Sequence, residues 1–189
     1  MYDYYDIAYN DYLFMRGAER TKQYNNLCTQ AQQIAEKLLK SVAENVIPPD
    51  SKNLMNGHNL RLLYREIRKA VPEFKVKSES DLVALKDMYY DVRYPGENYF
   101  IATEDQYIES VETVEDIIQQ VNLFRKANDL PVKDFQAPDS FEEEATAYLG
   151  DSLAEDFLRS VPSALKRPDN IKELVDIYIK TLKDKQSED

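Results

Sequence analysis

The first residue of the sequence with a candidate chemical role is an arginine close to the end of a helical pattern. The stretch "MYYDVRYPG" ends in Pro95 and Gly96, which stop a helix because proline cannot donate to the helical ladder and glycine tolerates the turn that follows. Arg93 therefore lies in the last helical turn or just beyond it. Its planar guanidinium suits phosphate oxygens, and it equally suits a helix cap or an ion pair with Asp91 or Glu97. The sequence leaves both roles open.

The chain has few other residues of the types that carry catalysis. His58 is its single histidine and Cys28 its single cysteine. Cys28 lies in a helical apolar pattern and is predicted to be a core thiol rather than a nucleophile. These two residues cannot build a structural zinc site, and no glycine-rich phosphate loop or Ser/His/Asp constellation occurs. We therefore predict no metal, no cofactor and no conventional catalytic group, which leans toward a protein that is not an enzyme.

The net charge of −11 is distributed unevenly along the chain. Residues 1–100 hold 14 acidic and 14 basic side chains, whereas residues 101–189 hold 21 acidic and 10 basic ones. Long duplex DNA is not expected as a partner of this acidic protein, because it requires a broad basic surface. No run approaches the ~18 apolar residues that span a bilayer, and "MYDYYDIAYNDY" lacks the basic start of a signal peptide. We expect a cytoplasmic protein that does not enter a membrane.

Apolar residues recur at three- and four-residue steps along most of the chain, which predicts an all-α fold. The expected architecture is an antiparallel up-and-down helical bundle over residues 1–130. An acidic helical extension over residues 131–189 is expected to pack on the bundle or on a partner. Helical patterns are predicted over residues 4–15, 24–46, 58–71, 78–95, 103–128 and 141–161, and from residue 170 onward.

Several helix starts and faces can also be predicted. Cap patterns occur at Ser78-x-x-Asp81, Thr103-x-x-Gln106 and Asn170-x-x-Glu173. Glu36 and Lys40 have the spacing of an exposed i,i+4 ion pair. A solvent-facing basic stripe is expected from Arg61, Arg65 and Arg68. Core or dimer-interface positions are expected for Tyr89, Tyr90, Tyr94 and Tyr99.

Four of these stretches, taken in order, resemble the HEPN family of small all-α bundles. "AQQIAEKLLKSV" is similar to the family's second helix, and "HNLRLLYREI" is similar to the start of its third. "DMYYDVRYPG" resembles the end of the fourth helix in a branch that carries "xRYPG". The tyrosine-rich first helix before "MRGAERTKQYNN" fits the usual entry. The resemblance covers residues 1–130 and excludes the extension.

The resemblance implies that the end of the fourth helix is where the family's catalytic residues would lie. Ribonucleases of the family use an arginine followed, five to seven positions later, by a histidine. Arg93 matches the arginine, but the histidine window contains Asn98, Tyr99 and Phe100. An asparagine cannot act as a general base near neutral pH. His58, at the start of the third helix, should lie near Arg93 if the third and fourth helices are antiparallel. It could replace the missing base, or it could be a helix-start histidine that bonds the backbone.

Three functions remain open at this point. The first is a non-catalytic HEPN-type binding module that holds a nucleotide or another phosphate ligand with Arg93, Tyr94, Asn98 and His58. By resemblance, such a module would be a homodimer and would accompany a nucleotidyltransferase, in a toxin–antitoxin-like pair. The second is a pure protein–protein interaction module in which Arg93 is structural. The third is a divergent, metal-independent ribonuclease that uses His58.

Overall fold

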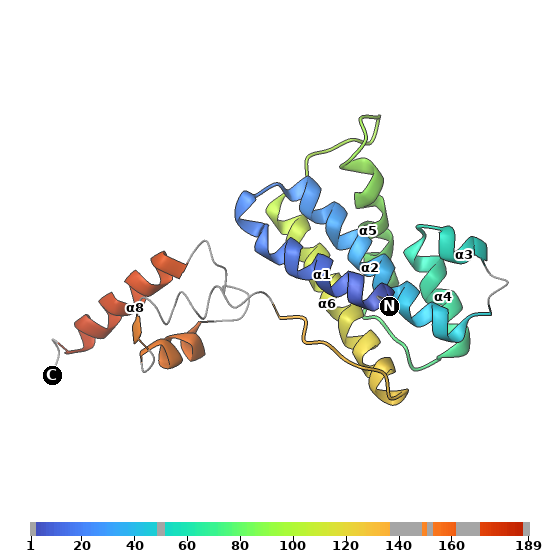
Figure 1. Ribbon diagram of the computed structural model, residues 1–189. Helices are drawn as coiled ribbons and strands as arrows, with labels where there is room; N and C mark the ends of the chain where they lie inside the picture. The colour runs from blue at the N-terminus through green and yellow to red at the C-terminus, as the bar shows by residue number, and fades with distance from the viewer. Residues whose placement is uncertain (1–2, 49–51, 137–148, 151–152, 162–170, 187–189) are drawn as a thin grey trace. The chain divides into compact units, whose positions relative to one another are not determined.

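The computed structural model describes residues 3–48, 52–136, 149–150, 153–161 and 171–186. The chain divides into two compact units, Met1–Phe135 and Gln136–Asp189 (Figure 1). All regular elements in the described ranges are helices, with no strand among them. The predicted all-α class is therefore confirmed. None of the described helices is long and apolar enough to cross a membrane.

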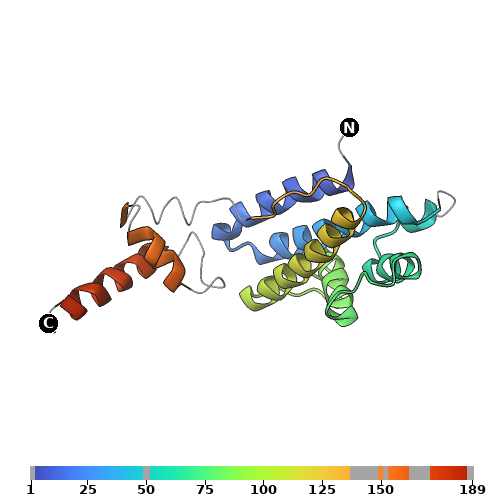
Figure 2. The same ribbon diagram turned by 90° about the horizontal axis from the view of Figure 1, so that it is seen from below.

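Helix α2 (Tyr24–Val46) is the central element of the first unit. It packs against α1 (Tyr4–Gly17), α4 (Leu60–Ala70), α5 (Glu79–Asp91) and α6 (Glu104–Ala127), and it runs through the middle of the unit (Figure 1, Figure 2). Apolar or small side chains cover much of its circumference. The buried ones are Leu27, Cys28, Ala31, Ile34, Ala35, Leu38, Leu39, Val42 and Ala43. A helix with so wide an apolar surface is stable only when other helices surround it.

The helices around α2 bury the faces that their periodicity predicts. In α4 and at its end, the buried positions are Leu60, Leu63, Tyr64, Ile67 and Val71. In α6, they include Tyr107, Val111, Val114, Ile118 and Val121. Two short elements lie in the connections, the 3₁₀ turn η1 (Glu19–Thr21) and α3 (Lys52–Asn56). Helix α3 forms between the helices predicted over residues 24–46 and 58–71, where no helix was expected, and its Leu54 and Met55 pack on the core.

The helix starts show which cap predictions were correct. Helix α6 begins with the predicted capping box, in which Gln106 N donates to Thr103 Oγ1 at 3.3 Å and Thr103 N donates to Gln106 Oε1 at 2.9 Å. The predicted box at α5 is wrong. Ser78 occupies the N-cap position, but its hydroxyl bonds the Ser80 hydroxyl at 2.6 Å instead of a backbone amide. The pattern that starts at Asn170 lies outside the described residues.

The prediction that Glu36 and Lys40 form an exposed pair is also wrong. The two residues are ion-paired, with Lys40 Nζ 2.7 Å from Glu36 Oε1. However, Glu36 is only 8% exposed and Lys40 only 6% exposed. The physical reason is the central position of α2, because neighbouring helices cover even its polar positions. The preceding residue of the same stripe, Gln32, is fully buried.

Residues 131–135 continue beyond α6 and fold back onto α1. The ring of Phe135 meets three α1 rings edge-on. The partners are Tyr5, Tyr9 and Tyr12, at centroid distances of 5.4, 5.3 and 5.5 Å. In addition, Lys133 N donates to the Tyr5 hydroxyl at 2.8 Å. The first unit thus extends past the predicted limit at residue 130. The reason is that Tyr5, Tyr9 and Tyr12 of α1 form an aromatic socket for Phe135. We call residues 131–135, which this socket holds, the strap.

This socket leads to a stability prediction. Replacing Phe135 by alanine is expected to lower the free energy of unfolding by about 2 kcal/mol, since a partly buried phenylalanine loses its apolar contacts and its edge-to-face ring pairs. Chemical denaturation of the full chain measures this change. Val132→Ala is the control, because Val132 belongs to the same segment and is 37% exposed. Equal stability of the two variants would mean that Phe135 does not hold the strap.

The second unit is described at residue 136 and over residues 149–150, 153–161 and 171–186. It contains a helical segment over residues 153–160 and helix α8 (Ile171–Gln186). Its small core consists of Ala154, Phe157, Ile171 and Val175. The remainder of the predicted helix over residues 141–161 lies largely outside the described residues. The packing of the extension on the bundle or on a partner stays a prediction.

Candidate functional site

Arg93 lies just beyond α5, with its side chain exposed. Helix α5 ends at Asp91, and Val92 is its C-cap residue. The guanidinium of Arg93 lies against two aromatic rings, with its Cζ 5.3 Å from the centre of Tyr89 and 5.4 Å from that of Tyr94. Its Nη1 also donates to the Tyr89 hydroxyl at 3.1 Å. Among the described residues, no carboxylate pairs with this cation, including Asp91.

His58 contacts the same tyrosine from the start of the neighbouring helix. Its ring stacks on Tyr89 with the centroids 5.6 Å apart and an interplanar angle of 14°. Its Nδ1 lies 2.9 Å from Glu36 Oε2, and half of its side chain is exposed. The structure therefore brings His58 and Arg93 to one ring. The hydrogen-bond partner of His58 is a carboxylate of α2, not the backbone.

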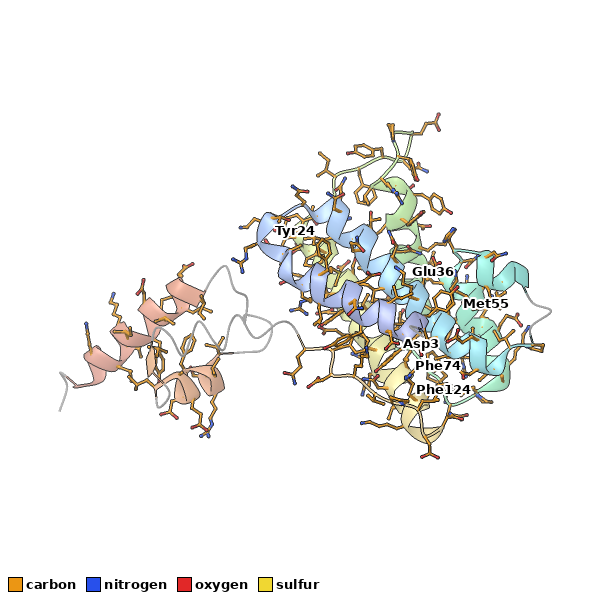
Figure 3. All side chains as sticks on the ribbon, viewed as in Figure 1. Asp3, Tyr24, Glu36, Met55, Phe74 and Phe124 are labelled. Carbon is orange, nitrogen blue, oxygen red and sulfur yellow. The ribbon has the colours of Figure 1, made fainter. Side chains whose placement is uncertain are left out.

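Glu36 joins this surface to the interior of the bundle (Figure 3). Its carboxylate bonds His58 and Lys40, and it accepts a third hydrogen bond from Gln32 Nε2 at 3.1 Å. Burial acts to raise the pKa of Glu36, but the hydrogen bonds from Lys40, His58 and Gln32 outweigh burial and hold this pKa below its usual value. Glu36 is therefore a buried anion that stays charged beside the half-exposed imidazole.

The loop that follows α5 is held by one residue of α2. Asn25 Nδ2 donates to Val92 O at 2.9 Å, and Asn25 Oδ1 accepts from Ala102 N at 2.7 Å. These two bonds fix the loop just before Arg93 and just before α6. Asn98 lies between them and is exposed, and none of its described contacts joins it to Arg93 or His58.

Three tyrosines in the last turn of α5 and in the loop after it are more exposed than predicted. Tyr90, Tyr94 and Tyr99 are 45%, 51% and 47% exposed, while Tyr89 is half-buried. A core position is therefore the wrong prediction for the first three. For Tyr94 and Tyr99, the reason is the early end of α5, after which the loop projects from the bundle and no helix covers it (Figure 1). Tyr90 is exposed in the last turn of α5 itself. Their place in a dimer interface stays a prediction.

The basic stripe of α4 takes no part in this site. Arg61 Nε and Arg65 Nη2 both lie 3.1 Å from Glu79 Oε2 at the start of α5. Both arginines are exposed, as predicted for a solvent face. No group of three or more metal-ligating side chains occurs in the described part of the chain.

The site thus consists of the Arg93 guanidinium and the His58 imidazole, both in contact with Tyr89. Arg93 presents a planar cationic fork. His58 presents its Nε2 edge while Glu36 holds Nδ1. Sequence reasoning missed Glu36 and Asn25 as positioning residues. The wide apolar surface of α2 was a signal that Glu36 is covered, whereas nothing local marks Asn25, since its partners are 67 and 77 positions away.

Comparison with known proteins places this bundle in a family. The model of the HEPN domain matches residues 1–124, which include α1 to α5 and most of α6. No curated protein and no solved structure matches the chain. The match covers well over half of the sequence and ends within the bundle, before the strap and the second unit. The chain belongs to the HEPN domain family.

Proposed function

We propose that the first unit is a non-catalytic HEPN-type binding module that holds a nucleotide or another phosphate ligand at Arg93. The observation that carries this proposal is the environment of the Arg93 guanidinium. It is exposed and rests against Tyr89 and Tyr94, without a carboxylate partner in the described residues. Stacking restricts the side chain in advance, so less conformational entropy is lost when a phosphate binds. His58 lies on the same ring and adds a second polar group.

Replacing Arg93 by alanine is expected to weaken nucleotide binding by roughly ten- to a hundredfold, because a charge-assisted contact contributes about 1.5–3 kcal/mol. Calorimetric titration with AMP, ATP and inorganic phosphate measures the effect, after a thermal-shift screen that selects the ligand. Arg93→Lys is expected to recover only part of the affinity, since lysine keeps the charge but lacks the planar fork.

Arg20→Ala is the matched control for this experiment. Arg20 is an exposed arginine of η1 in the same unit, and its loss removes the same charge elsewhere. Nucleotide binding that is unchanged in Arg93→Ala would contradict the proposal. It would favour the alternative in which the domain is purely a protein–protein interaction module and Arg93 is structural.

A second candidate function is metal-independent RNA cleavage with His58 as the proton-transfer group. The observation that favours it is the 2.9 Å contact between His58 Nδ1 and the buried Glu36 carboxylate. A carboxylate that accepts from Nδ1–H fixes the imidazole tautomer and leaves Nε2 to take or give a proton. Arg93, on the same tyrosine, would then stabilise the phosphate. We rank this function second because Asn98 stands where the resemblance implies a histidine.

We also propose that the module forms a two-fold homodimer through the end of α5 and the loop that follows it. Exposed apolar and aromatic side chains concentrate there, at Tyr90, Tyr94, Tyr99 and Ile101, the last of which is 76% exposed. Light scattering is expected to give twice the chain mass at micromolar concentration, and Ile101→Asp is expected to give the monomer. A monomeric wild-type protein would refute this part. A nucleotidyltransferase partner, which rests on the resemblance to the family, and a cytoplasmic location, which rests on the sequence, remain proposals.

A further inference from the structure

A groove lies between α5 and α6, away from the site around Tyr89. Its volume is about 720 Å³, and its α6 wall extends from Gln106 to Gln119. That wall is about 20 Å long at the ~1.5 Å rise per residue of a helix. Ala84 and Met88 of α5 contribute accessible apolar surface to the groove, whereas Leu85 lines it but is only 2% exposed. The α6 wall is therefore long enough for about four turns of a helix, and the α5 side offers apolar surface at Ala84 and Met88.

The polar lining of this groove is strongly acidic. Asp81 contributes from α5, and Glu109 and Glu112 contribute from α6. All three are exposed, and none forms an ion pair within the described residues. Glu109 and Glu112 are three residues apart and so lie on one face of α6. Lys77 is the single cation among the described residues that line the groove.

Two further acidic residues line the groove but, unlike these three, are bonded to other parts of the fold. Glu115 Oε1 accepts from Arg16 Nη1 at 2.8 Å, and the buried Asp116 accepts from Lys77 N at 2.7 Å. These carboxylates have roles within the fold, since they join α6 to α1 and to the segment before α5. Asp81, Glu109 and Glu112 have no such role. Their charges remain available to a partner.

We propose that this groove binds a basic amphipathic helix of a partner protein. The apolar side of that helix would contact Ala84 and Met88, and its lysine or arginine side chains would pair with Asp81, Glu109 and Glu112. This is the helix-in-groove mode of recognition, with charge complementarity selecting the partner. A phosphate ligand is excluded here by repulsion, so the groove and the Arg93 site serve different partners.

A second copy of this chain is a weaker occupant. The most basic helix face in the described part of the chain belongs to α4, and Glu79 already neutralises Arg61 and Arg65 there. The described region of α8 carries Lys180 and Lys183 but also Glu173 and Asp176. Neither face offers the net positive charge that three unpaired carboxylates require.

The experiment measures binding of a designed peptide to the full chain. The peptide is an amphipathic Leu/Lys helix of about four turns that carries a fluorophore, and its anisotropy reports binding. A scrambled peptide of the same composition and a Leu/Glu counterpart are the peptide controls. We expect the amphipathic Leu/Lys peptide to bind best, with an affinity that falls as salt increases. Glu109→Gln combined with Glu112→Gln is expected to weaken binding by roughly five- to thirtyfold.

The matched protein control is Glu73→Gln combined with Asp87→Asn. Both residues are exposed acids of the same unit that do not line the groove, and the double change removes the same charge. To locate the peptide, a fluorescent label is attached to the cysteine of the variant Thr113→Cys, which lines the groove. The native Cys28 is buried and does not compete for the label. Saturable quenching by the peptide supports the proposal.

Three results would overturn this inference. One is equal binding of the scrambled peptide, and another is equal loss in the two double variants. The third is a change in the fluorescence of the label at position 113 when only the protein concentration is raised, without peptide. That result would assign the groove to self-association of this chain. Arg93→Ala is expected to bind the peptide as wild type does. Its behaviour separates a failure of this inference from a failure of the nucleotide proposal.

Discussion

Glu36→Ala is expected to lower the free energy of unfolding of the first unit by about 3–5 kcal/mol, the range observed when one partner of a buried ion pair is removed. The substitution leaves Lys40, only 6% exposed, without its carboxylate. Gln32 Nε2 and His58 Nδ1 lose their partner as well. Water can reach the half-exposed His58, but it cannot easily replace the bonds of the buried Lys40 and Gln32, so these two groups bear their full desolvation penalty. Chemical denaturation measures the change.

The control is the pair formed by Glu66 and Lys69 on α4. Its side chains are 32% and 70% exposed, at an N–O distance of 2.6 Å. Glu66→Ala is expected to change stability by less than about 0.5 kcal/mol, since exposed pairs contribute little. Glu36→Leu combined with Lys40→Met should be far milder than Glu36→Ala, because no unpaired charge remains. If Glu36→Ala were as mild as Glu66→Ala, the buried pair would have no structural importance.

The lowered pKa of Glu36 also sets the sign of a pH effect. A carboxyl whose pKa is lower in the folded state than its ordinary value of 4.5 binds protons more readily when the chain is unfolded. Its contribution to stability is therefore complete above about pH 5 and is lost as the pH falls through the folded pKa. The stability difference between wild type and Glu36→Gln should shrink in the same range. A difference that stays constant down to acid pH would contradict the lowered pKa.

The purified protein is expected to leave RNA uncut, within the sensitivity of an assay that detects HEPN-type ribonucleases. General acid–base catalysis is typically responsible for a factor of ~10²–10⁴ in rate. The exposed amide of Asn98 cannot supply it, because it neither takes nor gives a proton near neutral pH. The measurement is gel-based cleavage of a labelled single-stranded RNA in the presence of a chelator, with wild type, His58→Ala and Glu36→Gln.

Cleavage by the wild type that is lost in His58→Ala would contradict this expectation and establish the second candidate function. In that case Glu36→Gln should also slow the reaction and shift its pH profile, because it alters how His58 holds its proton. Cleavage that survives in His58→Ala would instead indicate a contaminating nuclease. Nucleotide binding to Arg93 is measured separately, so the two functions do not depend on one assay.

The sequence determined the class of the fold and most of its local structure. The apolar steps of α2, α4 and α6 are set by the 3.6-residue period of the helix itself, so they predict which side is buried without knowledge of the neighbours. The capping box at Thr103 and the helix stop before Pro95 are local for the same reason. The serine at position 78 shows the limit of this reasoning, since an adjacent hydroxyl of Ser80 competes for its hydrogen bond.

The sequence also supplied the order of motifs that resembles the HEPN family, and the family model confirms that membership over residues 1–124. It indicated that His58 and Arg93 should be neighbours, because a short connection makes consecutive helices antiparallel. In the structure, Tyr89 lies in contact with both. Whether these residues bind a ligand depends on chemistry that neither periodicity nor topology specifies.

Only the tertiary structure decided how polar groups far apart in the sequence are combined. Glu36 and Lys40 have the spacing of a surface pair, and they are buried because four helices surround α2. Asn25 holds a loop that lies 67 to 77 residues away, and Phe135 closes a socket on the first helix of the chain. Such contacts depend on the packing of whole helices. A local pattern determines which face of a helix is apolar, but the neighbours that cover its remaining faces determine which of its charges are buried.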